Sequence, residues 1–369
     1  MKRASKLKIT IDVRMIDSSG IGTYLQNLIP KIISHYKGID FSLLGYKKMA
    51  DRFSWTRCDN AVLINCNSNI YSIAEQLELF QKIPKDTTLL WSPHFNIPLL
   101  YTGKLVVTIH DMFHIAMPEF IKGLHKKLYS KGMFTAVCHK ADAILCVSKF
   151  TKAELTRLMN VDNLIIHTIY NGVNRKWSST EKKTRPYIKP YIFFVGNVKP
   201  HKNIVRLIDA FQRILNKTPH DLVIVGKRDE FITGDKEAFI RASKLGERIY
   251  FAGYIDDDTL KSYYSYADAL VFPSLYEGFG MPPIEAMACG CPVIASNAAS
   301  LPEICGDAAY YVDPYDVESI AEGMHKVLTD DNLRQNLIKK GRERARLFSW
   351  EKSADEYIKV FDEVLGAYG

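Results

Sequence analysis

Short apolar segments alternate with segments of helical periodicity along nearly the whole sequence. Strands that alternate with helices are typical of βαβ units, in which parallel strands form a sheet covered by helices. The alternation therefore predicts an α/β protein built on doubly wound parallel sheets. The expected strands are Lys8–Val13, Phe41–Gly45, Leu89–Trp91, Leu105–Ile109, Ala143–Val147, Tyr191–Val195, Leu222–Val225, Ile249–Phe251, Ala269–Phe272 and Pro292–Ala295. The expected helices are Ile21–Ser34, Ile204–Leu215, Asp257–Tyr266, Pro283–Cys289, Val317–Thr329 and Trp350–Leu365.

The alternation is interrupted once, by a polar, charged and proline-bounded stretch at 171–190. Such a stretch is typical of an interdomain linker, and 369 residues suffice for about two domains. We therefore expect a first domain over 1–172, a linker over 173–190 and a second domain from 191 to 354. In parallel sheets ligands bind beyond the carboxyl ends of the strands, so the residues that follow each strand are the candidates for a site.

Charge and cysteine content limit the partners and the compartment. The net charge of +8 favours an acidic partner such as a phosphorylated substrate, an anionic membrane surface or a nucleic acid, although a merely basic enzyme has the same excess. Seven cysteines, an odd number, indicate reduced thiols in a cytoplasm. The basic N-terminus has no apolar region typical of a secretory signal, and no apolar run is long enough to span a bilayer. We expect a cytoplasmic protein.

Two motifs in the first half follow expected strands. Gly20 and Gly22 stand in SSGIGTY, directly before a helix, where glycine lets a backbone approach a ligand and a helix N-terminus favours an anion. A tight strand–helix turn explains the same glycines. His110 ends an apolar strand in TIHD, where it can donate a hydrogen bond to a substrate oxygen with Asp111 orienting it. A structural His–Asp pair is the alternative.

Two further motifs lie in the second half. The loop VGNVKPHKN places Lys202 close to a helix start, which suits a diphosphate, although a solvated basic loop has the same composition. In EGFGMPPIE, Glu277 and Glu285 stand eight residues apart around a glycine loop and the proline-marked start of a helix. Exposed backbone N–H groups there favour an anion, and an ionised carboxylate accepts hydrogen bonds from vicinal hydroxyls of a sugar.

In this order and spacing, the motifs resemble those of glycosyltransferase family 4, whose members have the two-domain GT-B fold. Glu277 to Glu285 is similar to the E-x7-E motif of that family, and SGIGTY, TIHD and VGNVKPHKN match its other signatures. The resemblance implies two Rossmann-like domains that face each other across a cleft. It also implies that a C-terminal helix, about 355–369, returns to the first domain, which would meet the acceptor, while the second binds the nucleotide sugar.

The resemblance further implies α-retaining transfer of a hexose from a nucleotide-diphosphate sugar, with no metal or other cofactor required. It gives catalytic roles to Lys202 at the diphosphate, Glu277 at the donor-sugar hydroxyls, and His110 near donor sugar and acceptor. The implied donor-binding residues are Gly20, Gly22, Asn197, Lys202, Lys227, Tyr254, Gly278, Phe279, Gly280 and Glu285, the last at the ribose. Asn197 follows Gly196 where many members of the family have a nearby arginine, so the second cation stays open between Lys227 and Arg228.

Several alternatives remain at this point. A front-face substitution is the mechanism implied by the family, and Glu277 as a covalent nucleophile is its rival. Asp256–Asp258 resembles a metal-binding acidic cluster, but it stands directly before an expected helix and is better explained as its N-cap. The segment Ile121–Lys140 mixes lysines with leucines, as in a helix on anionic lipid or an ordinary surface helix.

The donor and the acceptor are the least constrained. VGNVKPHKN resembles the form found in mannosyltransferases that use GDP-mannose, and a UDP-sugar donor is the alternative. We expect a glycan or lipid-linked saccharide acceptor, in cell-surface polysaccharide or lipopolysaccharide synthesis, with peripheral contact at the inner face of the plasma membrane as a further hypothesis. A GT-B epimerase or phosphorylase is a less favoured enzyme class. No nucleic-acid module is recognised, and no nucleic-acid partner is expected.

Overall fold

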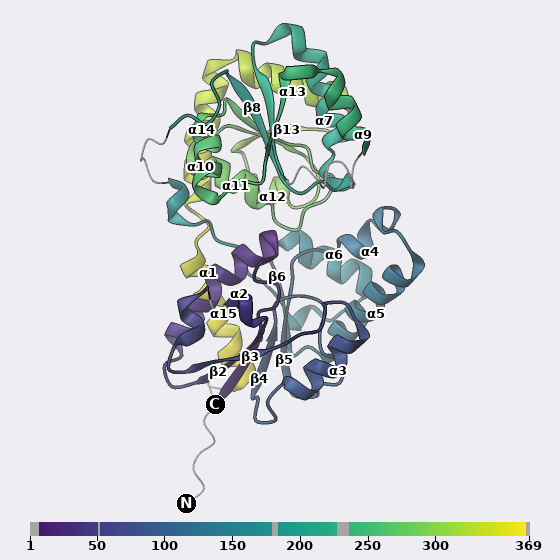
Figure 1. Ribbon diagram of the computed structural model, residues 1–369, viewed down its shortest axis with the longest axis vertical. Coiled ribbons are helices and arrows are strands. Elements are labelled where there is room, and N and C mark those ends of the chain that lie inside the picture. The colour runs from purple at the N-terminus through teal and green to yellow at the C-terminus, as the bar shows by residue number, and fades with distance from the viewer. Residues whose placement is uncertain (1–6, 51, 179–183, 227–235, 367–369) are drawn as a thin grey trace, which may run out of the picture. The chain divides into compact units, whose positions relative to one another are not determined.

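The computed structural model describes residues 7–50, 52–178, 184–226 and 236–366, and the chain divides into two compact units (Figure 1). Unit 1 comprises Met1–Gly172 and Ser349–Gly369, and unit 2 comprises Val173–Phe348. The stretch expected as a linker belongs to unit 2, where Arg175–Ser178 forms the 3₁₀ helix η4. Residues 349–354, placed in the second domain by the sequence, belong to unit 1.

Unit 1 is built on a seven-stranded, all-parallel sheet in the order β3-β2-β1-β4-β5-β6-β7. The strand order reverses between β1 and β4, which makes their carboxyl ends the topological switch point of this sheet. The strands are β1 (Lys8–Asp12), β2 (Asp40–Gly45), β3 (Ala61–Asn65), β4 (Leu89–Ser92), β5 (Lys104–Ile109), β6 (Ala143–Cys146) and β7 (Ile166–Thr168). The helices are α1 (Ser19–His35), α2 (Lys47–Ala50), α3 (Ile73–Lys82), α4 (Phe113–Ala116), α5 (Leu124–Lys140), α6 (Lys149–Met159) and α15 (Trp350–Leu365), with 3₁₀ helices η1 (Ser54–Arg57), η2 (Pro118–Phe120) and η3 (Asn163–Ile165).

Unit 2 repeats the plan with six parallel strands in the order β10-β9-β8-β11-β12-β13, and its switch point falls between β8 and β11. The strands are β8 (Tyr191–Val195), β9 (Asp221–Val225), β10 (Ile249–Gly253), β11 (Ala269–Phe272), β12 (Val293–Ser296) and β13 (Ala309–Val312). The helices are α7 (Ile204–Ile214), α9 (Lys236–Lys244), α10 (Asp257–Tyr266), α11 (Met281–Cys289), α12 (Leu301–Cys305), α13 (Val317–Thr329) and α14 (Asp331–Ala345), with η5 (Pro200–Lys202), η6 (Leu215–Lys217) and η7 (Gly246–Arg248). The predicted fold class, two Rossmann-like α/β units, is confirmed.

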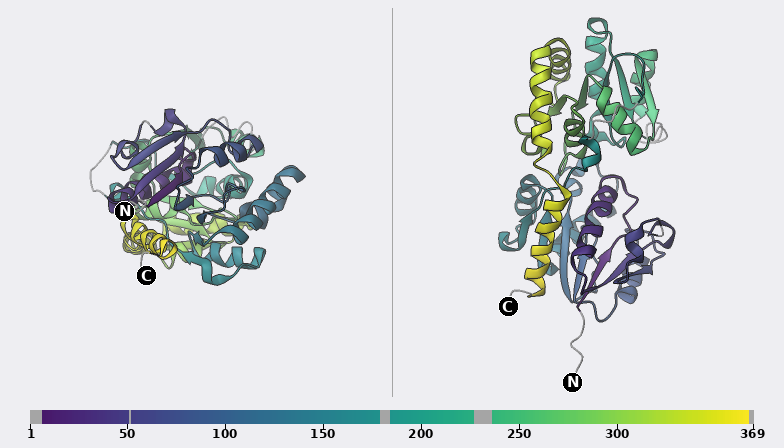
Figure 2. Two further views of the ribbon diagram at one scale, coloured as in Figure 1. Left: turned by 90° about the horizontal axis from the view of Figure 1, so that it is seen from below. Right: turned by 90° about the vertical axis from the view of Figure 1, so that its left-hand side faces the viewer.

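Unit 1 is closed by the last helix of the chain. Helix α15 packs against α1 and lies along the sheet beside β4 and β5 (Figure 2). Its Tyr357 is buried, and the Tyr357 hydroxyl accepts a hydrogen bond of 2.5 Å from Tyr24 of α1. Thr108 of β5 lies 2.9 Å from the Tyr24 hydroxyl and accepts a hydrogen bond of 3.1 Å from the Trp91 indole. This network ties two distant parts of the sequence into one core.

Among the described residues, no helix combines the length and apolarity that crossing a bilayer requires.

Candidate active site

Lys202 and Glu277 meet at the switch point of unit 2. Lys202 ends η5, in the loop that follows β8, and Glu277 lies in the loop that follows β11. Lys202 Nζ donates a hydrogen bond of 2.6 Å to Glu277 Oε1 and lies 5.6 Å from the ring centre of Phe272. Both side chains are mostly buried. Two residues 75 positions apart thus form one charge pair at the edge where an open α/β sheet binds its ligand.

The loop that carries Lys202 is fastened to the loop after β11. The buried Asn203 amide donates hydrogen bonds to the carbonyl oxygens of Pro273, at 3.0 Å, and Pro314, at 2.6 Å. The His201 carbonyl accepts from the Leu275 backbone N–H at 2.8 Å. Because Lys202 stands between these two anchors, its backbone is held in place whether or not its ammonium group has a ligand.

The glycine loop before α11 forms as the motif predicts. Gly280 is the N-cap at φ 105°, a left-handed conformation, and a Cβ there would meet Leu301 at 2.7 Å. The Ser300 hydroxyl lies 2.9 Å from the carbonyl oxygens of both Glu277 and Phe279, which fixes the loop. The Phe279 side chain is buried edge-on against Phe348, at 5.6 Å between ring centres, so only its backbone is available to a donor. Pro282 and Pro283 carry no N–H, so the N–H groups that the start of α11 offers an anion are those of Gly280 and Met281, beside the positive end of the helix dipole.

Glu285 lies in the second turn of α11, away from the ion pair of Lys202. It is 8% exposed and accepts a hydrogen bond of 3.2 Å from the Tyr264 hydroxyl. Burial, followed by the negative charge of Asp257, raises the pKa of Glu285 to about 8. Tyr264 is the partner that the sequence did not indicate. Besides the bond from Tyr264, the carboxyl oxygens of Glu285 have further lone pairs that can accept a hydrogen bond from a hydroxyl ligand.

The remaining predicted residues of unit 2 are placed as follows. Asn197 is half-buried in the loop after β8. Tyr254 follows β10 and is 79% exposed. Gly278 lies between Glu277 and the start of α11. Lys227 and Arg228, the candidates for the second cation, lie outside the described residues.

In unit 1, the two glycines of the first motif differ in their surroundings. Gly20 is exposed in the first turn of α1, and a Cβ there would meet nothing within 4 Å. Gly22 is buried, and a Cβ would meet the carbonyl oxygen of Ile16 at 2.4 Å. The tight turn therefore requires Gly22, whereas no packing requirement of the turn explains Gly20.

His110 directly follows β5 and contacts the loop after β4. Its Nε2 donates a hydrogen bond of 2.9 Å to the Pro93 carbonyl, and its ring meets Tyr24 edge-on at 4.8 Å. Burial lowers the pKa of His110. The ring is therefore neutral, with Nδ1 as the acceptor. Asp111, expected to orient the ring, instead caps the following turn by accepting from the Phe113 backbone N–H at 3.0 Å.

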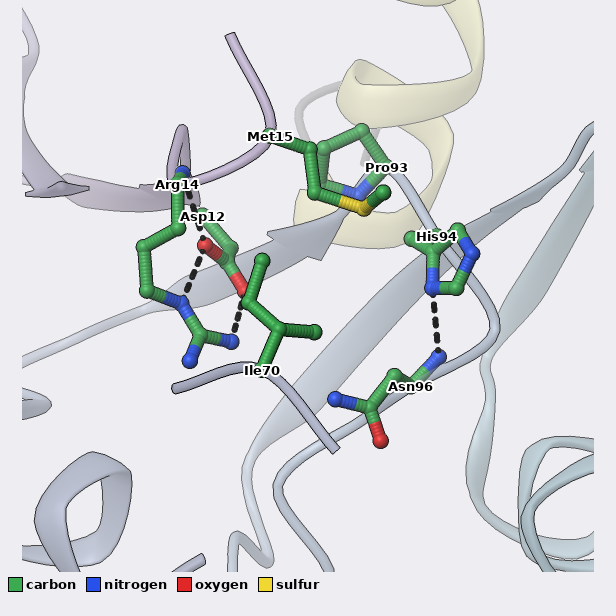
Figure 3. A pocket seen from close by; sticks show the side chains of 7 residues that line it. All are labelled: Asp12, Arg14, Met15, Ile70, Pro93, His94 and Asn96. Carbon is green, nitrogen blue, oxygen red and sulfur yellow. Dashed lines mark hydrogen bonds and ion pairs between the residues drawn. The ribbon is translucent and has the colours of Figure 1, made fainter. Parts of the chain in front are cut away.

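A small hollow that no sequence motif marked lies at the switch point of unit 1 (Figure 3). Its lining residues come from the ends of β1 and β4 and from the loop before α3. They are Asp12, Arg14, Met15, Ile70, Pro93, His94 and Asn96. The sequence contained a signal for these residues, because polar residues directly follow β1 and β4. Ligands of parallel sheets bind beyond the carboxyl ends of the strands, which is the rule that pointed to the four motifs.

The acidic cluster before α10 is a helix cap. The Asp256 carboxylate accepts a hydrogen bond of 2.8 Å from the Thr259 backbone N–H, as the capping interpretation predicted. Asp257 pairs with Lys176. In the part of the chain that the structure describes, no group of three or more His, Cys, Asp or Glu side chains is placed to hold a metal ion.

Comparisons with known proteins identify the chain. Residues 175–344 match the family model of glycosyl transferases group 1, and residues 86–177 match that of glycosyltransferase family 4. The O-antigen chain mannosyltransferase B of Escherichia coli is 31% identical to this chain, and the match covers 73% of this chain and 72% of that protein. The O-antigen chain mannosyltransferase RfbU of Salmonella typhimurium is 33% identical over 63% of this chain and 62% of its own. Sucrose-phosphate synthase from Thermosynechococcus elongatus has a similar fold, with a TM-score of 0.79, 22% identity and coverage of 98% of this chain and 100% of its own.

Two Rossmann-like units with these matches define a glycosyltransferase of the GT-B fold. More particularly, the chain belongs to glycosyltransferase family 4, as a member similar to mannosyltransferases.

Proposed function

We propose that the protein transfers mannose from GDP-mannose, with retention of the α configuration, to a glycan or lipid-linked saccharide of a cell-surface polysaccharide or lipopolysaccharide. The observation that carries the proposal is the Lys202–Glu277 pair beside the start of α11, in a chain whose relatives include O-antigen mannosyltransferases. The ammonium of Lys202 and the positive end of the α11 helix dipole supply positive potential for a diphosphate leaving group. The carboxyl oxygens of Glu285 can accept hydrogen bonds from the hydroxyl groups of the nucleotide ribose.

The transfer itself exchanges one bond for another at the anomeric carbon. The C–O bond to the diphosphate breaks, and a bond to the acceptor hydroxyl oxygen forms on the same face. The acceptor proton passes to the leaving phosphate oxygen, so no protein base is required. Glu277 is held by Lys202 in the free protein, which favours a role in binding over one as a covalent nucleophile; trapping a glycosyl adduct on Glu277 would reverse this assignment. The chemistry uses charges of the chain, and we expect no requirement for a divalent metal.

A thermal-shift panel tests the donor. GDP, UDP, GDP-mannose, UDP-glucose and UDP-N-acetylglucosamine are each added with and without EDTA, since a ligand of the native state raises the Tm by mass action. A shift selective for GDP compounds and insensitive to EDTA supports the proposal. A shift selective for UDP compounds would show that the donor is a UDP-sugar instead of GDP-mannose. The absence of any shift would contradict the assignment of the nucleotide-sugar site in unit 2. NMR of the product then gives the anomeric configuration.

We also propose that α5 places unit 1 on an anionic membrane surface, where a lipid-linked acceptor would be found. Met133, Phe134 and Val137 of this helix are buried, whereas Leu124 and Leu128 are 70% and 60% exposed. Lys122, Lys126 and Lys131 are exposed beside these leucines. Exposed apolar side chains flanked by lysines are typical of a helix that binds anionic headgroups.

A further inference from the structure

The loop that follows β11 lies between two neighbouring loops of unit 2. The strand order β8-β11-β12 places the loop after β8, which carries Lys202, on one side of it. The loop after β12, which carries Ser300, lies on the other side. Glu277 and the glycine loop belong to the middle segment, so contacts from both sides determine where its backbone groups point.

Ser300 contacts the middle loop instead of its own helix. It is the N-cap residue of α12, where a serine side chain normally accepts a hydrogen bond from a backbone N–H of the first turn. In α12, whose residues the structure describes in full, that capping bond is not made. The fully buried Ser300 hydroxyl lies instead 2.9 Å from the carbonyl oxygens of both Glu277 and Phe279, so its one proton is shared between them. The Ser300 backbone N–H also donates to the Glu277 carbonyl, at 3.4 Å.

The turn before Ser300 is strained. Ala299 has a φ of 55°, in the left-handed region that residues with a Cβ rarely adopt. Strain of this kind persists only where the surrounding structure imposes it, and it clusters at functional sites. The strained residue directly precedes the serine whose N–H and hydroxyl both bond to Glu277, and these bonds hold the turn in place.

The hydrogen bonds from Ser300 also determine the direction of an N–H group. In a planar trans peptide unit the C=O and N–H groups point in opposite directions. The Phe279 carbonyl faces Ser300, on the side of β12, so the Gly280 N–H of the same peptide unit faces away from it, on the side of β8 and Lys202. The bond to the Glu277 carbonyl fixes the backbone of the residue whose carboxylate pairs with Lys202 at 2.6 Å.

We propose that Ser300 is a positioning residue. Through the carbonyls of Glu277 and Phe279 it holds the Gly280 N–H and the Lys202–Glu277 pair in one arrangement that receives a diphosphate. A donor group fixed in advance stabilises an anion more than one that must first reorient. That the diphosphate belongs to a nucleotide sugar rests on the proposed function; the orientation of the peptide unit rests on the geometry of the loop alone.

A single NMR signal reports on both ends of this peptide unit. The pair Phe-Gly occurs once in the sequence, at Phe279 and Gly280. A chain labelled with ¹³C at the phenylalanine carbonyls and with ¹⁵N in glycine therefore gives one correlation that joins the carbonyl carbon beside Ser300 to the Gly280 N–H. Inorganic pyrophosphate is the probe, titrated into the wild type and into Ser300→Ala.

Ser296→Ala is the matched control. The Ser296 hydroxyl is fully buried in the same unit and donates a hydrogen bond of 2.6 Å to the Ser274 carbonyl, which lies in the same loop as Glu277. Each variant thus removes one buried hydroxyl that holds this loop, and we expect both to lower the Tm. A role of Ser300 in stability alone would therefore give the two variants the same anion binding.

We expect pyrophosphate to shift the Gly280 amide signal of the wild type. In Ser300→Ala the carbonyl frequency of Phe279 should change, and the Kd for pyrophosphate should rise about tenfold. Ser296→Ala should change neither quantity. A wild type whose amide signal does not shift, an unchanged Kd in Ser300→Ala, or an equal rise in Ser296→Ala would each overturn the role of Ser300.

Titrations of the same labelled chains with GDP and UDP separate this role from the proposed function. A wild type that responds to pyrophosphate but to neither nucleotide would contradict the proposed function, and the pyrophosphate result would still decide the role of Ser300. Equal GDP affinity of the wild type and Ser300→Ala would overturn the role of Ser300 and leave the proposed function standing.

Discussion

Lys202 neutralises Glu277 in the free protein, so a donor diphosphate must compete with that carboxylate for the ammonium group. Glu277→Gln removes the competing charge. We expect this variant to bind GDP at least as tightly as the wild type, while turnover falls at least about tenfold because the donor-sugar contact is weakened. Lys202→Ala should weaken GDP binding by about tenfold to a hundredfold. Calorimetric titration with GDP and initial rates with the donor separate the two effects.

The control for this pair is Glu318→Gln, which breaks the exposed pair of Arg213 and Glu318 and should change neither quantity. A parallel loss of GDP affinity and turnover in Glu277→Gln would show that Glu277 supports Lys202 and does not compete with the diphosphate.

The pKa of Glu285 makes the stability of unit 2 depend on pH. Because folding raises this pKa from 4.5 to about 8, the native state binds more protons than the unfolded state between these values. The stability that this proton contributes is full below about pH 4.5 and is lost as pH rises through 8. Glu285→Gln is neutral and retains an acceptor for Tyr264. At pH 8.5 we expect the free energy of unfolding of the variant to exceed that of the wild type by more than about 1 kcal/mol. At pH 5 this difference should be much smaller. Urea unfolding at both pH values measures this, and equal differences would contradict it.

The sequence identified single residues of the candidate site better than their partners. Lys202 and Glu277 were both predicted, but their pairing depends on the adjacency of β8 and β11, which no local pattern encodes. Glu285 was predicted without Tyr264 for the same reason. Ile70 of the hollow in unit 1 was missed because it follows β3, a strand that the sequence did not indicate.

At the scale of elements, the strands that escaped prediction are β3, β7 and β13. Each lies at an edge of its sheet. An edge strand has one neighbour and is less completely buried, so its sequence mixes polar with apolar residues: Val62 of β3 is 63% exposed, and β7 reads IHT. Interior strands are buried on both faces and read as continuous apolar runs, which explains why the sequence predicted every one of them.

Helix α5 gives a prediction at the same scale. Replacing Leu124 and Leu128 by serine removes the exposed apolar side chains without touching the buried face. We expect the double variant to lose most of its binding to vesicles of phosphatidylcholine and phosphatidylglycerol at low salt, while its Tm stays unchanged. Leu164→Ser, in η3, removes a leucine that is 85% exposed and serves as the control. Flotation of the vesicles measures binding, and a wild type that does not float with them would refute the membrane proposal.

At the scale of the whole molecule, the chain leaves unit 1 at Gly172 and returns to it at Ser349. Unit 1 is therefore complete only when the last helix is in place. The sequence predicted the two sheets because each consists of local βαβ units. The return of α15 was implied by the family resemblance, since a helix in the chain after unit 2 carries no local signal of the sheet that it covers.

Tyr357 tests this dependence. Its side chain is fully buried between α1 and β5, so Tyr357→Ala leaves a cavity and breaks the network with Tyr24; large-to-small changes of this kind cost about 3–5 kcal/mol. We expect hydrogen exchange to accelerate in peptides of β4 and β5, while peptides of β8 and β11 keep their protection. Tyr357→Phe retains the packing and should have a much smaller effect, because Thr108 still lies within hydrogen-bonding distance of the Tyr24 hydroxyl. Loss of protection in β8 equal to that in β5 would show that α15 stabilises more than unit 1, and that the two units unfold as one.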